Sequence, residues 1–155
     1  MEASITFKAI AKSFRKNMLL ADLTFGVEKG STFVLIGANS SGKSVILKML
    51  VGLIEKDAGM AYINGKDINT RSEETRSVTG YMPQIIDLDD ELTIFENLYI
   101  HAQLHGLDKK NALDNISHWA EILDISESLS LMPDSLSYGE KRKVIFARAI
   151  IHDPE

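Results

Sequence analysis

Short segments in which apolar and polar residues alternate open the chain. Residues 4–8 and 23–27 alternate in this way, as strands with one buried face do. Residues 60–63 and 66–68 flank an Asn-Gly pair, which is a common pair at a tight hairpin turn. These patterns predict antiparallel strands in the first part of the chain.

A continuous apolar run follows the second of these segments. Residues 32–36 come after a turn at 28–30 and are apolar almost throughout, which predicts a strand buried on both faces. Residues 37–44 then lead into a second apolar run, 45–51, which ends at Gly52 as a helix does. A strand, a loop and a helix in this order predict a right-handed crossover and a parallel sheet.

Later in the chain the pattern changes to helical spacing. Residues 78–82 predict one more short strand, closed by Pro83. From Thr93 onward, apolar residues recur at intervals of three or four, and a last helix is predicted from Ser137 to a break at Pro154. The apolar stripes are Ile94, Leu98 and Ala102, then Trp119, Ile122 and Leu123, and then Val144, Ala147 and Ile151.

Composition limits the classes of protein that fit. The chain has 155 residues, of which 45% are hydrophobic, enough for one globular domain with a core. It has no cysteine, which excludes disulfides and thiolate metal sites. No apolar stretch is long enough to span a bilayer, and the first residues lack the pattern of a signal peptide. Any role at a membrane is therefore expected to come through a partner.

The net charge of −5 is unevenly distributed. Residues 1–84 hold 11 basic and 8 acidic residues, whereas residues 85–155 hold 6 basic and 14 acidic ones. The first part suits an anionic ligand, while the second argues against nucleic acid as a partner. A solvated acidic surface is the simplest interpretation of the second part.

Residues 37–44 match the pattern G-x-x-x-x-G-K-[ST] without a gap. Such a loop points successive backbone N–H groups at a phosphate, and its second glycine allows close approach. Lys43 is then expected to reach the β- and γ-phosphates, and the Ser44 hydroxyl to take a position on Mg²⁺. A surface Gly-Lys-Ser turn is the alternative, but the predicted strand before the loop and helix after it favour nucleotide binding.

Three further segments occur in a fixed order around this loop. Residues 136–140 read Leu-Ser-Tyr-Gly-Glu, residues 81–84 read Tyr-Met-Pro-Gln, and Phe14 precedes the loop. Taken singly, Ser137 is an ordinary helix cap, Gln84 a polar loop residue and Phe14 a core aromatic. Taken together with the loop, they resemble the LSGGQ-type signature, the Q-loop and the adenine-stacking aromatic of the ABC ATPases, and the resemblance spans the chain.

The resemblance implies an α/β fold of the P-loop NTPase class. It has a parallel core sheet, an N-terminal antiparallel β subdomain and an α-helical subdomain. Residues 1–155 would form a partial ABC ATPase domain, with the β subdomain and P-loop core in 1–87, the helical subdomain in 88–136, and the signature helix returning to the core in 137–155. The last core strands are missing from this sequence.

The resemblance also implies the ligands and the residues that bind them. ATP and Mg²⁺ are the expected cofactors, with Lys43 and Gln84 in catalytic roles and Ser44 and Gln84 at the metal. Gln84 would also touch the attacking water. The expected nucleotide-binding residues are Phe14, Gly37, Ala38, Asn39, Ser40, Ser41, Gly42, Lys43, Ser44, Val45, Ser137, Gly139 and Glu140.

The implied partners are a second ATP-binding subunit and a transmembrane permease. ATP would lie between the phosphate loop of one subunit and the signature of the other. The permease would bind the helical subdomain and the Gln84 region, which places the protein in the cytoplasm on the cytoplasmic face of the membrane. Residues 91–98 and 104–107 resemble bacterial exporter-type subunits of the drug-efflux kind.

Departures from the family pattern are small in the loop and large at the end. Ser40 stands where glycine is frequent, Val45 where threonine is frequent, and Glu140 where glutamine is frequent. The Walker B Asp and Glu and the switch His of the family are absent, and the histidines present are expected to lie at the surface. The 155 residues alone are therefore expected not to hydrolyse ATP and to leave apolar faces exposed.

Three functional hypotheses remain at this point. The first is the ATPase subunit of an ABC transporter, present in part. The second is a truncated nucleotide-binding protein that does not hydrolyse ATP. The third is a soluble ABC ATPase that does not act in transport.

Overall fold

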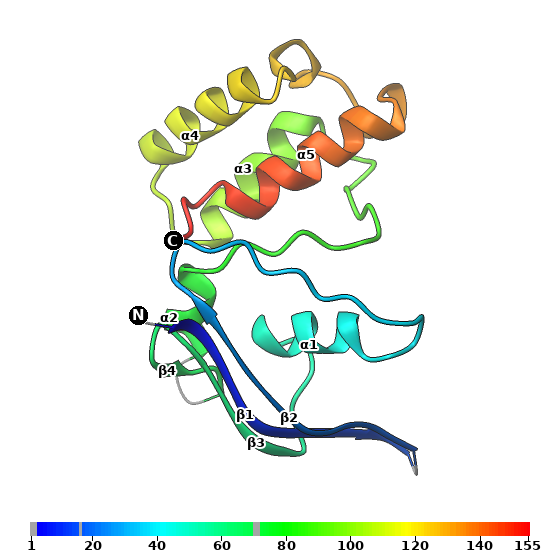
Figure 1. Ribbon diagram of the computed structural model, residues 1–155. Coiled ribbons are helices and arrows are strands. Elements are labelled where there is room, and N and C mark those ends of the chain that lie inside the picture. Colours follow the sequence, from blue (N-terminus) through cyan, green and yellow to red (C-terminus); the bar gives the residue numbers. More distant parts are fainter. Residues whose placement is uncertain (1–2, 16, 70–71) are drawn as a thin grey trace. The chain divides into compact units, whose positions relative to one another are not determined.

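A computed structural model describes residues 3–15, 17–69 and 72–155. The chain divides into two compact units, residues 1–76 and residues 77–155, and each is considered by itself. The first unit contains a sheet, a helix and most of a second, short helix, and the second unit contains three longer helices (Figure 1). Every helix among the described residues is too short or too polar to cross a bilayer.

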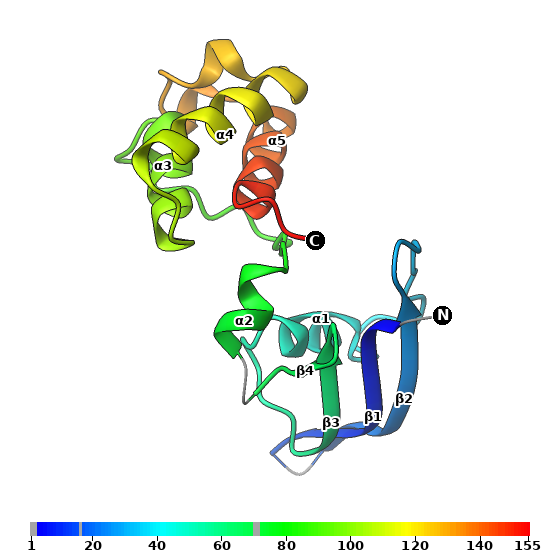
Figure 2. The same ribbon diagram turned by 90° about the vertical axis from the view of Figure 1, so that its left-hand side faces the viewer.

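The first unit is built on antiparallel strands. Strand β1 (Ala3–Phe14) pairs with β2 (Asn17–Glu28) on one side and with β3 (Ala58–Ile63) on the other, and β3 pairs with the short β4 (Lys66–Asp67). The strand order is β2-β1-β3-β4, which Figure 2 shows edge to edge. The predicted strands at 4–8 and 23–27 are confirmed.

The hairpin predicted at the Asn-Gly pair is also confirmed. Asn64 and Gly65 connect β3 to β4 and have φ values of 48° and 74°. Two successive residues with positive φ are the requirement of a type I′ turn, which matches the twist of paired strands. Local sequence is therefore sufficient to place this hairpin.

Helix α1 (Lys43–Leu50) follows the phosphate loop as predicted. Its buried residues, Ile46 and Met49, are three apart, as on one face of a helix. Gly52 follows the helix with a φ of 74°, a conformation that glycine adopts readily at a helix end. The buried core residues of this unit are Phe7, Ile10, Leu20, Ile46, Met49, Ala61, Ile63 and Ile68.

Two predicted strands are not formed. Residues 32–36 and 78–82 belong to no strand, and the sheet of the described residues is antiparallel throughout. Ile36 is 90% exposed, although this run was predicted to be buried on both faces. A strand needs hydrogen-bond partners along its edges. Among the described residues, no neighbouring strand supplies such partners to residues 32–36 or to residues 78–82.

The second unit packs three helices around one core. After the short helix α2 (Ser72–Ser77), these are α3 (Ile94–Leu104), α4 (Lys109–Ile122) and α5 (Tyr138–Ile150). Two 3₁₀ turns, η1 (Ser126–Ser128) and η2 (Pro133–Ser135), connect α4 to α5. The core comprises Ile94, Leu98, Ala102, Ala112, Ile116, Ala120, Ile125, Leu136, Val144, Ala147 and Ile151.

The helix starts agree with the predictions, and one predicted stripe is wrong at a single position. Thr93 caps α3, and Ser137 caps α5. In the predicted stripe of α4, Trp119 and Leu123 pack against the core, whereas Ile122 was misassigned, because it is 57% exposed. The most deeply buried face carries Ala112, Ile116 and Ala120, and its alanines allow close approach of a neighbouring helix.

Candidate nucleotide and signature sites

The phosphate loop, residues 37–44, encloses its own lysine. The Lys43 Nζ donates hydrogen bonds to the carbonyl oxygens of Gly37 at 2.8 Å and Ala38 at 2.7 Å. The backbone N–H of Ser41 donates to the same Ala38 carbonyl at 3.3 Å. The ammonium group therefore lies over the loop that the sequence assigns to phosphate.

Two loop residues adopt left-handed backbone conformations. Gly42 has a φ of 94°, which favours glycine, and a Cβ there would also lie 2.8 Å from the end of the Leu20 side chain, which would have to move. Ser40 has a φ of 64°, which confirms the strain predicted for a serine in place of glycine. The left-handed conformation costs a non-glycine residue about 1 kcal/mol.

The rest of the loop is accessible from solvent. Residues 37–41 and Ser44 are exposed, while Lys43 and Val45 are half-buried. α1 begins at Lys43, so the positive end of its helix dipole lies next to the loop. Exposed backbone, a positive helix end and a lysine together form a site suited to an anion.

Phe14 lies at the end of β1 with its ring 46% exposed. The alternative in which it is a core aromatic is therefore wrong. The Lys12 Nζ lies 5.4 Å from the ring centroid and also pairs with the Asp57 carboxylate at 2.7 Å. An exposed aromatic face is available to stack on a planar ligand.

The signature segment, residues 136–140, leads into α5 through a capping box. Ser137 accepts a hydrogen bond from the Glu140 N–H at 3.3 Å, and the Glu140 carboxylate accepts from the Ser137 hydroxyl at 2.6 Å and the Ser137 N–H at 2.9 Å. These bonds hold the pKa of Glu140 below its usual range. The Glu140 carboxylate thus occupies the helix start that the sequence predicts to be an anion site.

Gly139 leaves the outer side of this helix start open. The nearest atom to a Cβ at Gly139 would be the Ser137 Oγ at 4.0 Å, so a side chain would point into space. Ser137 and Gly139 are both exposed. The surface beside the capping box is therefore accessible to another molecule.

Gln84 is exposed and lies in the same unit as the signature segment. The Arg142 Nη1 of α5 donates to the backbone carbonyls of Pro83 and Gln84 at 3.1 and 3.2 Å. The structure thus brings the predicted Q-loop and the signature helix together, whereas Phe14 and the phosphate loop belong to the other unit.

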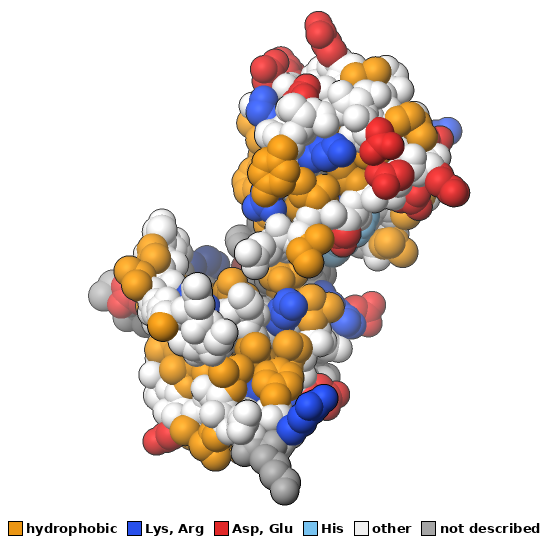
Figure 3. Space-filling model, turned by 90° about the vertical axis from the view of Figure 1, so that its right-hand side faces the viewer, with side chains coloured by type: hydrophobic (Ala, Val, Ile, Leu, Met, Phe, Trp, Pro, Cys, Tyr) orange, Lys and Arg blue, Asp and Glu red, His pale blue; other side chains and the backbone are white. Residues whose placement is uncertain are grey.

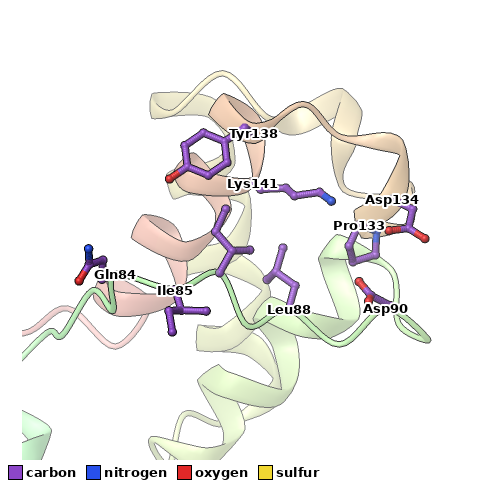
Figure 4. A pocket seen from close by; sticks show the side chains of 9 residues that line it. Gln84, Ile85, Leu88, Asp90, Pro133, Asp134, Tyr138 and Lys141 are labelled. Carbon is purple, nitrogen blue, oxygen red and sulfur yellow. The ribbon is translucent and has the colours of Figure 1, made fainter.

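A groove of about 470 Å³ opens beside Gln84 (Figure 4). Apolar side chains line it together with two carboxylates and one ammonium group. The lining residues are Gln84, Ile85, Ile86, Leu88, Asp90, Pro133, Asp134, Tyr138 and Lys141. Ile85 is 77% and Tyr138 is 71% exposed, so two large side chains face solvent here.

A second hollow, of about 590 Å³, opens in the first unit. Apolar residues of β2, of α1 and of residues 33–35 line most of it, and Lys43 and Ser44 lie at its wall. Figure 3 shows hydrophobic side chains gathered at the surface of this unit, in the lower part of the view. The predicted exposure of apolar faces is confirmed.

The predicted surface positions are confirmed for His105 and His118, which are exposed, whereas His101 and His152 are half-buried. The rings of His105 and His152 stack with centroids 3.7 Å apart, and the ring nitrogens of His152 are buried. Burial, then the Arg148 charge and then His105 lower the pKa of His101 to about 4. The four-residue spacing of His101 and His105 was the one available signal. No cluster of three or more potential metal ligands exists among the described residues.

Comparisons with known proteins agree with these features. A model of the ABC transporter family matches residues 20–155. The molybdate/tungstate import ATP-binding protein WtpC of Thermococcus kodakarensis is 34% identical over 148 residues, which are 96% of this chain and 44% of that protein. The Nod factor export ATP-binding protein I of Rhizobium sp. is 32% identical over 99% of this chain and 51% of its own length.

Solved structures show the same fold. The ATP-binding subunit of an ABC transporter superposes with a TM-score of 0.86 at 30% identity, over 97% of this chain and 62% of the other. CbiO1 from Clostridium perfringens, part of the transporter complex cbiONQ, gives a TM-score of 0.85 at 16% identity, over 99% and 63%. The chain spans about half the length of the curated relatives it matches. With the phosphate loop, the signature segment and the family match in agreement, the chain belongs to the ABC transporter family, as an α/β ATP-binding component with the P-loop NTPase fold.

Proposed function

We propose that this chain binds Mg²⁺-ATP at its phosphate loop and forms part of a transporter motor subunit. The observation that carries the proposal is the Lys43 ammonium held against the Gly37 and Ala38 carbonyls at the start of α1. When a phosphate binds, Lys43 exchanges these carbonyls for phosphate oxygens, which form stronger charge-assisted bonds. Ser44, exposed beside it, takes a place on Mg²⁺.

Calorimetric titration of the purified chain with Mg²⁺-ATP tests this proposal. Lys43→Ala is expected to lower the affinity at least tenfold, because hydrogen bonds to charged groups contribute about 1.5–3 kcal/mol. Lys48→Ala is the matched control, since Lys48 is exposed on the same helix outside the loop. Equal affinities for the two variants would contradict the proposal.

The remaining nucleotide contacts are assigned on the same basis. The exposed ring of Phe14 stacks on adenine, and the backbone of residues 37–45 encloses the phosphates. Gln84 reaches the metal and the attacking water. The family is one of ATPases, and hydrolysis is proposed for the complete protein with the Walker B carboxylates and switch His that the family supplies.

A second ATP-binding subunit completes the site. In this arrangement the ATP held by one phosphate loop is covered by Ser137 and Gly139 of the other subunit. The open surface at Gly139 supports this assignment. The Glu140 carboxylate, which now accepts from the Ser137 N–H and hydroxyl, gives way to the γ-phosphate there.

The groove beside Gln84 is the proposed docking site of a permease subunit. Its exposed Ile85 and Tyr138 offer apolar surface to a partner, and it adjoins the residue that senses nucleotide. Docking there would hold the protein on the cytoplasmic face of the membrane. Matched relatives include import and export subunits, so the proposal covers transport in general, and the exporter-type resemblance stays a prediction.

A further inference from the structure

The backbone around Gln84 lacks regular secondary structure. Residues 82–87, called here the Gln84 segment, belong to no helix or strand. Their carbonyl groups therefore lack the regular backbone hydrogen bonds of a helix or sheet and need hydrogen-bond donors from elsewhere, such as side chains or water. The segment also supplies Gln84, Ile85 and Ile86 to the wall of the groove.

Arg142 of α5 holds the first half of this segment. Its Nη1 donates to the carbonyls of Pro83 and Gln84, and its Nη2 lies 3.7 Å from the Met82 Sδ. One guanidinium thus contacts three consecutive residues. A guanidinium is planar and carries five donors in a fixed arrangement, so these contacts restrict both the position and the orientation of the backbone.

Arg148 holds the other end of the segment. Its Nη1 donates to the Asp87 carbonyl at 2.9 Å, and its Nη2 forms a short ion pair with the Asp87 carboxylate. The Arg148 side chain is 10% exposed and the Asp87 side chain 62%, so only the guanidinium end of this pair is shielded from solvent. The two arginines are six positions apart, which places them about 9 Å apart along the helix axis.

We propose that Arg142 is a positioning residue for Gln84, which it fixes to the helix that begins at the signature segment. The Gln84 backbone is held while its side chain remains exposed, an arrangement that presents the amide to a ligand in a constant place. Gln84 and the signature segment then respond to nucleotide as one body. This inference rests on the proposed contact of Gln84 with Mg²⁺-ATP.

The test separates positioning from simple packing by measuring what Mg²⁺ adds to ATP affinity. For each variant of the chain, the affinity for ATP is measured with Mg²⁺ and with a chelator, and the ratio gives the Mg²⁺ gain. Arg142→Ala is expected to lose the same gain as Gln84→Ala and to leave chelated ATP binding unchanged. The double variant should lose no more of the Mg²⁺ gain than either single variant. Its loss should therefore be at least about threefold smaller than the product of the two single losses, as expected for coupled neighbours.

Two further variants guard against misfolding and general charge effects. Arg142→Lys keeps the charge and the stem but not the planar arrangement, so it should retain part of the gain. Lys143→Ala removes the next cation of α5, which lies near Asp124 and not near the Gln84 segment, and should retain all of it. If Arg142→Ala keeps a Mg²⁺ gain that Gln84→Ala loses, the positioning role is overturned.

The outcome for Gln84→Ala distinguishes the inference from the function on which it rests. If Gln84→Ala keeps the full gain while Lys43→Ala loses ATP, nucleotide binding stands, and both the role of Gln84 and the positioning inference fail. A second readout uses the absence of cysteine, since Ile85→Cys gives a unique site for a nitroxide label. The label should become more mobile with Arg142→Ala and not with Lys143→Ala, and unchanged mobility would contradict the anchoring.

Discussion

The helical unit and the phosphate-loop unit differ in how well they cover the apolar segments that the sequence predicts to be buried. The helical unit encloses a core of eleven residues, of which Leu98 and Val144 are fully buried. In the other unit Phe33, Val34 and Ile36 are 49%, 68% and 90% exposed. A helix satisfies its own backbone and needs only a neighbour for one face, whereas a central strand needs partners on both edges. The helical unit is therefore the more self-sufficient part.

The largest expected contrast comes from truncating one apolar residue in each unit. Leu98→Ala is expected to lower the free energy of unfolding by about 3 kcal/mol, because it leaves a cavity in a closed core. Ile36→Ala should change it by less than about 0.5 kcal/mol, because the Ile36 side chain is already 90% exposed. Urea denaturation followed by Trp119 fluorescence, which reports on α4, and by circular dichroism measures both. Similar losses for the two variants would remove the contrast.

A smaller effect is expected at the cap of α3. Thr93 accepts from the Glu96 N–H at 3.2 Å, and Glu96 accepts from the Thr93 N–H at 2.8 Å. Thr93→Ala should lower the free energy of unfolding by about 1 kcal/mol, since it leaves a helix N–H without its partner. Thr93→Ser keeps the hydroxyl and should retain most of that stability in the same urea experiment. A loss as large with serine would show that the methyl group, and not the cap, is responsible.

The last effect is a pH dependence that comes from the histidines of the helical unit. Burial lowers the pKa of His101 to about 4, while Asp87 opposes the shift, and burial also lowers the pKa of His105 and His152. In the unfolded chain a histidine has a pKa of about 6.5, so below that pH it binds a proton that the folded histidine, with its lower pKa, does not bind. Stability is therefore complete above pH 6.5 and declines as the pH falls toward 4.

His101→Gln should reduce this slope, and the exposed His118→Gln is its matched control. Midpoints of urea denaturation measured between pH 7 and pH 5 would give both slopes. An unchanged slope for His101→Gln would mean that the histidine cluster does not sense protons through this residue.

Local signals in the sequence predicted local structure well. The Asn-Gly hairpin, the phosphate loop with its left-handed Ser40, and the caps at Thr93 and Ser137 each depend on residues within a few positions. Their geometry follows from backbone preferences and nearby hydrogen bonds, which the sequence displays directly. The family resemblance, confirmed by the match over residues 20–155, rests on such local segments.

Long-range contacts were not predictable in the same way. The stacking of His105 on His152 joins residues far apart in the chain, and the apolar sequence of 32–36 does not reveal whether strand partners are present. The inward face of α4 depended on which neighbour it met, so Ile122 was assigned to the wrong side. Arg142 carried no motif that linked it to Gln84.

The sequence by itself determined the family, the phosphate loop and the helix starts, because each is encoded in a short run of residues. Tertiary structure decided which apolar runs are covered, which histidines approach one another and which arginines hold the Gln84 segment. The physical reason is that burial and hydrogen-bond satisfaction depend on neighbours distant in sequence, and only folding brings these neighbours together.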